Sequence, residues 1–177
     1  IQLDNDKLTI KIDKNPDFEN QYKALKNQGG YMVLHSGELT TSSRNIRHND
    51  AKEICLCLSY FVTFLNGRRC SPHFLQGINN GKVIWTDYSN TVVDTYKPVS
   101  TWIVENSIDG YDELWKNFYS IWSDANGKDF LNTAIHWYVE ANSNSGLVEG
   151  SIIMAQAALE LIYNWLIIET KKMLLMK

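Results

Sequence analysis

The chain has 177 residues, of which 44% are hydrophobic and 12% aromatic, and its formal net charge is −3. This composition supports a packed core and excludes bulk disorder, and the slightly acidic balance excludes a protein that attracts nucleic acid through a global basic field. Three cysteines without a disulfide framework indicate reduced thiols in a cytoplasmic protein. The sequence has no phosphate-binding glycine loop, nucleophile elbow or metal-ligand spacing, so we expect no cofactor and no metal.

The beginning of the chain is predicted to contain β-structure. Residues 8–12 alternate apolar and polar side chains, which is typical of a strand. Residues 31–35 predict a second strand, and the polar residues 39–49 that follow predict a loop.

The middle of the chain combines one helix with one hairpin. From Asp50 onward, apolar residues recur at helical spacing, with Asp50 and Glu53 predicted to cap the start and Gly67 predicted to end the helix. Asn80-Gly81 then predicts a tight hairpin turn, because this pair readily supplies positive φ angles. Residues 83–88 are the predicted return strand.

The last third is predicted to be helical. Residues 111–122 form an amphipathic pattern that ends near 125–127, and residues 129–141 form another. A polar break at 142–146 separates this pattern from the last helix, residues 149–168.

That last helix is apolar around almost its whole circumference. Its length approaches that of a membrane span, but Gln156, Glu160 and Asn164 interrupt it at four-residue spacing. We therefore expect no membrane insertion and predict a homodimer packed through this helix. Because the final residues are still helix-forming and the first residue is not Met, we also expect a fragment of a longer protein.

The elements together predict an α+β fold. Residues 1–108 are expected to form a β-rich module, a small antiparallel sheet with one packed helix. Residues 109–177 are expected to form a helical region that begins a bundle.

The candidate catalytic residues are His136, Glu140 and Glu160. His136 and Glu140 lie one turn apart on one face of their predicted helix. A carboxylate in an apolar helix needs a partner, so two interpretations of Glu160 stay open. It belongs either to a structural hydrogen-bond network or to an acid–base site with His136 or Glu140.

A local basic patch offers a candidate nucleic-acid interface. Its arginines would contact the phosphate backbone, while Trp85 and Tyr88 would stack on bases. The predicted nucleic-acid-binding residues are Arg44, Arg47, Arg68 and Arg69.

Five stretches of the sequence carry a resemblance to a known group of proteins: residues 34–39, 62–68, 77–85, 134–141 and 149–161. Together they resemble bacterial defence proteins of the ApeA type, in which a β-rich N-terminal region precedes a HEPN domain. The resemblance implies HEPN helices that can form a dimeric ribonuclease. The Arg-x(4–6)-His motif of that family lies on a later helix, and no residue of this sequence takes its place.

The resemblance therefore implies a function in two parts. The chain would be the N-terminal and linking part of a HEPN-type antiviral ribonuclease, or abortive-infection protein, that senses or binds a ligand such as RNA and dimerises. Ribonuclease activity would require a catalytic motif beyond residue 177. The alternative is a non-catalytic protein-interaction module whose last helix is buried by a partner.

Overall fold

The computed structural model describes residues 1–5, 7–42, 45–103, 110–143 and 148–175, and its fold is α+β, as predicted. Three antiparallel strands form one sheet in the order β1 (Gln2–Asp4), β2 (Leu8–Lys14) and β3 (His35–Thr41). A separate hairpin pairs β4 (Leu75–Asn79) with β5 (Lys82–Asp87). The single sheet predicted from the sequence is thus two sheets in the described part of the chain. The predicted boundary between residues 108 and 109 lies outside the described residues.

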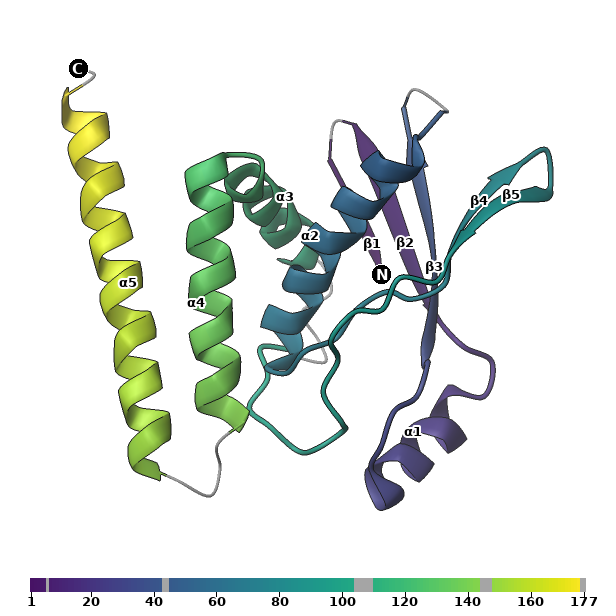
Figure 1. Cartoon of the computed structure of the whole chain (residues 1–177), viewed down its shortest axis with the longest axis horizontal. Coiled ribbons are helices and arrows are strands. Elements are labelled where there is room, and N and C mark those ends of the chain that lie inside the picture. Colours follow the sequence, from purple (N-terminus) through teal and green to yellow (C-terminus); the bar gives the residue numbers. More distant parts are fainter. Residues whose placement is uncertain (6, 43–44, 104–109, 144–147, 176–177) are drawn as a thin grey trace.

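Five helices are described. They are α1 (Phe18–Gln28), α2 (His48–Asn66), α3 (Gly110–Trp122), α4 (Ala125–Ser143) and α5 (Val148–Leu175). Figure 1 shows that α2 to α5 lie to one side of the three-stranded sheet. Helix α2 lies across the sheet, and α4 stands between α2 and α5. Helix α5 lies at one outer edge, and the β4–β5 hairpin projects at the opposite edge.

One hydrophobic core joins the sheet to α2, α3 and α4. The register places Leu3 opposite Ile10 and Ile10 opposite Leu39, so one face of the sheet is a row of aliphatic side chains. Phe61 of α2 and Trp115 of α3 meet edge to face over this row, with ring centroids 5.2 Å apart. Trp115 is completely buried, so the helices after residue 108 pack directly on the β-rich part.

The end of α2 is where the sequence predicts it, but its start is not. Gly67 has a left-handed φ of 67° and its N–H donates to the Thr63 carbonyl, which closes the helix. The helix begins at His48 rather than Asp50 and has no side-chain cap. The cap predicted from Asp50 and Glu53 is therefore wrong, because the helix extends two residues before Asp50.

The predicted strand at residues 31–35 is also wrong, since β3 begins only at His35. Gly29 and Gly30 both have positive φ and turn the chain before it reaches the sheet. Asn15 then holds residues 33 and 34 in place. Its side-chain amide donates to the carbonyl of residue 33 at 2.8 Å, and its backbone N–H donates to the carbonyl of residue 34 at 3.0 Å. Because β3 pairs with β2 only from His35 onward, Leu39 lies opposite Ile10, and this register places both side chains on the core side of the sheet.

Helix α1 was not predicted. A weak signal exists, because Phe18, Tyr22 and Leu25 follow each other at helical spacing. Only Leu25 of this helix is buried, so its apolar stripe is too short to stand out from its polar neighbours.

Residues 125–127 do not end a helix as predicted but open α4. The Asp124 carboxylate accepts the N–H of Gly127 at 2.8 Å and so serves the free donors of the first turn. A Cβ on Gly127 would overlap the Ile121 carbonyl, so glycine permits the close approach between the end of α3 and the start of α4.

The predicted hairpin turn is confirmed. Asn80 and Gly81 have φ angles of 49° and 75°, as a type I′ turn requires. The turn lies at the tip of the β4–β5 hairpin (Figure 1).

Replacing Gly81 with valine is expected to lower the free energy of unfolding by about 1–2 kcal/mol, because a β-branched residue disfavours positive φ. A Cβ at this position meets nothing within 4 Å, so the effect comes from the backbone alone. Thermal melting measures it, with Gly81→Asn as the matched control, since asparagine tolerates this conformation. An unchanged melting temperature for Gly81→Val contradicts the assignment of the turn.

Candidate functional site

Helix α5 packs on the molecule through α4, its most extensive contact with another element. The Phe130 ring of α4 stacks on Trp165 of α5, with centroids 4.5 Å apart and planes 13° apart. Ala158 is buried at the same contact. No described α5 residue belongs to the main hydrophobic core, so α5 lies outside it as the second helix of a helical hairpin.

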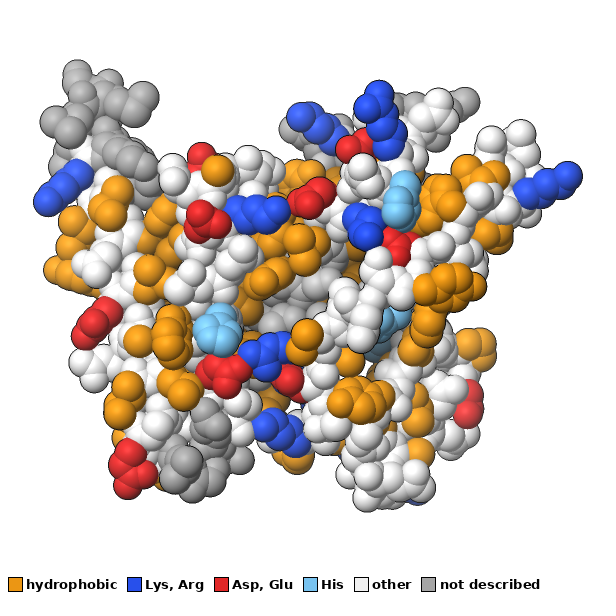
Figure 2. All heavy atoms as spheres, in the orientation of Figure 1, with side chains coloured by type: hydrophobic (Ala, Val, Ile, Leu, Met, Phe, Trp, Pro, Cys, Tyr) orange, Lys and Arg blue, Asp and Glu red, His pale blue; other side chains and the backbone are white. Residues whose placement is uncertain are grey.

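The face of α5 that α4 leaves uncovered carries a strip of apolar side chains, which we call the α5 seam. Figure 2 shows hydrophobic side chains along the outer edge of the molecule over α5. Leu159 is 66% exposed and Ile152 60% exposed, fractions that are unusual for aliphatic side chains on a helix. The seam consists of Val148, Ile152, Ala155, Leu159, Ile162 and Leu166, all exposed.

A polar strip runs beside the seam. Gln156 donates to the Glu160 carboxylate at 3.1 Å, and both are exposed, as is Asn164. The structural network predicted for a buried Glu160 is therefore wrong, because α4 covers a different face of α5. The partner of Glu160 comes from its own helix.

The three candidate catalytic residues are not brought together. Glu140 pairs with Arg69, while His136 is exposed on α4 with its ring 5.3 Å from that of Trp137. Within the described ranges, no group of three or more His, Cys, Asp and Glu side chains could hold a metal ion. A catalytic role for these residues stays a prediction.

Arg69 lies at the centre of a half-buried ionic cluster. Its guanidinium contacts Glu140 of α4 and lies 3.2 Å from the Asp94 carboxylate, which also accepts the Arg69 backbone N–H at 2.8 Å. The hydrogen bond to Glu140, reinforced by Asp94, raises the pKa of Arg69 despite its partial burial. The cluster fastens the segment after β5 and the helix α4 to the end of α2.

The other arginines predicted to bind nucleic acid do not belong to the Arg69 cluster. Arg68 lies over the Tyr96 ring, 4.4 Å from its centroid, and donates to the Lys97 carbonyl at 3.0 Å. Arg47 is exposed just before α2, and Arg44 lies outside the described residues. Arg68 and Arg69 are thus engaged within the chain, and whether any of the four binds nucleic acid stays a prediction.

The base of the β4–β5 hairpin is fixed by a second ionic cluster. The Asp87 carboxylate lies 2.9 Å from His48 and 3.1 Å from Lys52 of α2. Hydrogen bonds from Ser89, then from Lys52 and His48, hold the pKa of Asp87 well below its usual range. Trp85, predicted to stack on bases, instead meets the His48 ring edge to face at 4.7 Å, whereas Tyr88 is exposed.

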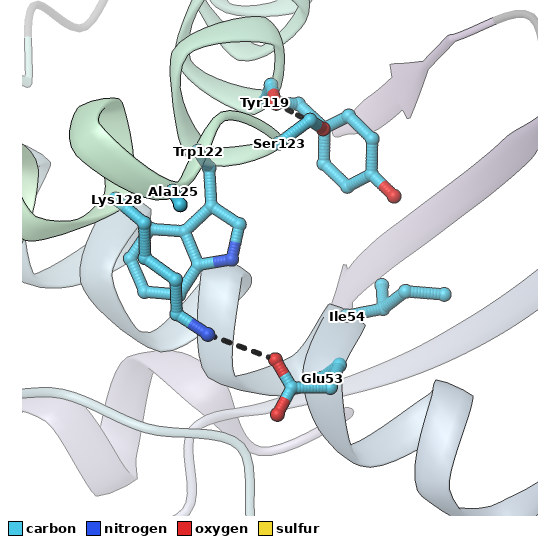
Figure 3. A pocket seen from close by; sticks show the side chains of 7 residues that line it. All are labelled: Glu53, Ile54, Tyr119, Trp122, Ser123, Ala125 and Lys128. Atoms are coloured by element: carbon cyan, nitrogen blue, oxygen red, sulfur yellow. Dashed lines mark hydrogen bonds and ion pairs between the residues drawn. The ribbon is translucent and has the colours of Figure 1, made fainter.

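A pocket of about 380 Å³ opens where α2, α3 and α4 meet (Figure 3). Lys128 crosses it to reach Glu53 at 3.0 Å and lies over the Trp122 ring. The Lys128–Glu53 ion pair thus lies in the same lining as the aromatic rings of Tyr119 and Trp122. Its lining is Glu53, Ile54, Tyr119, Trp122, Ser123, Ala125 and Lys128. The sequence pattern did not single out this pocket, because its walls come from three separate helices.

The cysteines offer no reactive thiolate. All three are free, and burial raises the pKa of Cys55 to about 11 and raises those of Cys57 and Cys70 as well. Thiol chemistry at neutral pH is therefore disfavoured at each of them.

Comparison with known proteins places the chain in a family. Residues 1–99, more than half of the chain, match the family model of the YopA central domain. The chain belongs to the YopA family. In this YopA-family chain, residues 124–177, which include α4 and α5, also match the model of the YopA C-terminal domain.

A curated relative is the SPbeta prophage-derived uncharacterized protein YopA of Bacillus subtilis (strain 168), 29% identical over 168 residues. The match covers 92% of this YopA-family chain and 38% of the relative, so the chain spans well under half of the relative's length. No solved structure matches the chain.

Proposed function

We propose that the chain is an association module, in which the α4–α5 hairpin is held by the body of the protein and the α5 seam binds a helix of another protein molecule. The observation that carries the proposal is the exposure of the seam. Each Å² of apolar surface left in water costs about 25 cal/mol, and contiguous apolar patches on soluble proteins commonly mark interfaces.

The pattern of the seam favours a helix as the partner. Its residues are spaced alternately by four and three positions from Val148 to Leu166. Alternating steps of four and three repeat every seven residues, which is the heptad spacing with which helices pack along a common seam.

Insertion of α5 into a membrane is less favourable than its binding to a protein helix. By length and composition, Val148–Ile168 is long and apolar enough to cross a membrane, and 6% of its apolar window is buried. Insertion would place the exposed Glu160 near the centre of the bilayer, at a cost of about 2.5–3.5 kcal/mol for such a charged residue. Beside a protein helix, the polar strip remains in water.

The resemblance to ApeA-type proteins supports a biological setting for this association. We propose a cytoplasmic, HEPN-type antiviral or abortive-infection protein, in which the module dimerises and senses or binds a ligand, with RNA as a candidate. A ribonuclease activity would then depend on a motif outside this sequence. The prophage origin of the Bacillus subtilis relative is compatible with a role in phage biology.

The proposal predicts that the chain associates in solution and that one charge on the seam prevents it. Leu159→Glu should weaken association at least about 30-fold, as expected for a central interface residue. Sedimentation velocity over a range of concentrations measures the association, and circular dichroism verifies that the helix content is kept.

The matched control is Asn164→Glu, which adds the same charge to the polar strip of the same helix and should associate like the parent. A strictly monomeric parent contradicts the proposal. So does a parent that floats with phosphatidylcholine vesicles and loses this binding in Leu159→Glu, since the seam would then bind lipid.

A further inference from the structure

The α5 seam has an internal order of side-chain sizes that identifies its partner. We infer that the partner is α5 of a second copy, running antiparallel, with Ala155 of each copy opposite Leu159 of the other. This inference rests on the proposed association function and adds the identity and direction of the partner helix.

The first step is the heptad pattern. Ile152, Leu159 and Leu166 are seven residues apart and form one series of core positions. Val148, Ala155 and Ile162, also exposed, form the other series, four residues before each member of the first. In antiparallel helix pairs, side chains of one series meet those of the other across the interface.

The second step is the size of the facing side chains. A twofold axis level with Ala157 pairs Ala155 with Leu159, Ile152 with Ile162, and Val148 with Leu166. The smallest side chain of the seam then faces a large one, so no layer consists of two small side chains. A parallel pair in register would instead place Ala155 against Ala155 and leave a void in the middle of the seam, which close-packed interfaces avoid.

The third step concerns charge. In the antiparallel pair, the two Glu160 carboxylates are displaced along the seam by six residues, or about 9 Å at the rise of an α-helix. A parallel pair would hold them at the same level. The antiparallel arrangement also opposes the two helix dipoles, which is the favourable orientation.

The fourth step is the position of α4. The seam lies roughly 90° around α5 from the face that contains Ala158 and Trp165, as the spacing of 100° per residue gives. A second α5 can therefore dock without displacing α4, and the two helical hairpins together make a four-helix arrangement. The exposed side chains of two seams offer on the order of 1,200 Å² in total, which is the lower end of specific, stable interfaces.

Disulfide trapping of the full chain tests the inference. Ala155→Cys and Leu159→Cys proteins are prepared separately, mixed, equilibrated and oxidised mildly, and the products are identified by intact mass. The antiparallel register brings the two new thiols within disulfide reach only between unlike variants. The mixed disulfide dimer should therefore exceed either like-with-like dimer at least about fivefold, beyond the twofold excess of random pairing.

The matched controls are the oxidised parent, which reports the three native cysteines, and an equal mixture of Gln156→Cys with Asn164→Cys on the polar strip, which should give no enrichment. Efficient trapping of each seam variant with itself overturns the antiparallel register while leaving the association function standing. A dimer that sediments as such but forms no seam disulfide in any combination overturns the second α5 as partner. A monomeric parent overturns both.

Discussion

Replacing Gly67 with valine is expected to destabilise the protein by about 3–5 kcal/mol, the largest single-residue effect outside the hydrophobic core. Two effects add. The left-handed φ of 67° disfavours a β-branched residue, and any Cβ would overlap the Ser100 carbonyl oxygen. That carbonyl accepts from Asn142 of α4 at 3.1 Å, so the overlap would also disturb the helix that carries α5.

Gly81→Val is the matched control for Gly67→Val. Both glycines have positive φ, but a Cβ on Gly81 enters open space. The difference between the two variants in urea-unfolding free energy therefore isolates the contact with the Ser100 segment. Equal effects for the two variants would mean that this segment moves aside freely and does not hold α4.

Arg69→Gln is expected to destabilise the protein by about 2 kcal/mol, because it leaves two half-buried carboxylates, Asp94 and Glu140, without their cation. The value is below that of a fully buried pair, since the Arg69 side chain is 30% exposed. Chemical unfolding at neutral pH measures the effect.

Arg68→Gln is the control for this substitution, because Arg68 contacts a ring and a carbonyl but no carboxylate, and it should cost less than about 1 kcal/mol. Equal losses of unfolding free energy for Arg68→Gln and Arg69→Gln would show that the two carboxylates do not need Arg69 for stability.

The result also bears on RNA binding: loss of binding in Arg69→Gln counts as a nucleic-acid contact only if the variant is still folded. Arg47→Gln avoids that ambiguity, since Arg47 is exposed.

Local signals explain what the sequence predicts well. The stop at Gly67 and the turn at Asn80-Gly81 each depend on the backbone preferences of one or two residues, so they can be read without knowing their neighbours. The α+β class likewise follows from periodicities within short windows.

The failures all depend on contacts between distant residues. The strand at 31–35 has a good local pattern, but the row formed by Ile10 and Leu39 sets the true register. Glu160 was expected inside the protein because its helix is apolar all round. Nothing in a helical wheel shows which third of that circumference α4 would cover.

The Arg69 cluster was missed for the same reason, since its members come from positions 69, 94 and 140. Each of these residues alone resembles an ordinary solvated charge. The α5 seam, in contrast, is visible as a heptad spacing in the sequence, although only the structure shows that this face is uncovered.

The contact of β1 with α3 has a consequence for biosynthesis. The backbone N–H of Asp4 donates to Asp112 at 2.7 Å, so these partners leave the ribosome 108 residues apart. Leu3 and Trp115 share the same core, and closing so long a loop makes their pairing a late, slow event. Part of the apolar face of the nascent sheet therefore stays exposed to solvent until α3 has been synthesised. During this interval a chaperone or a neighbouring nascent chain can bind that face.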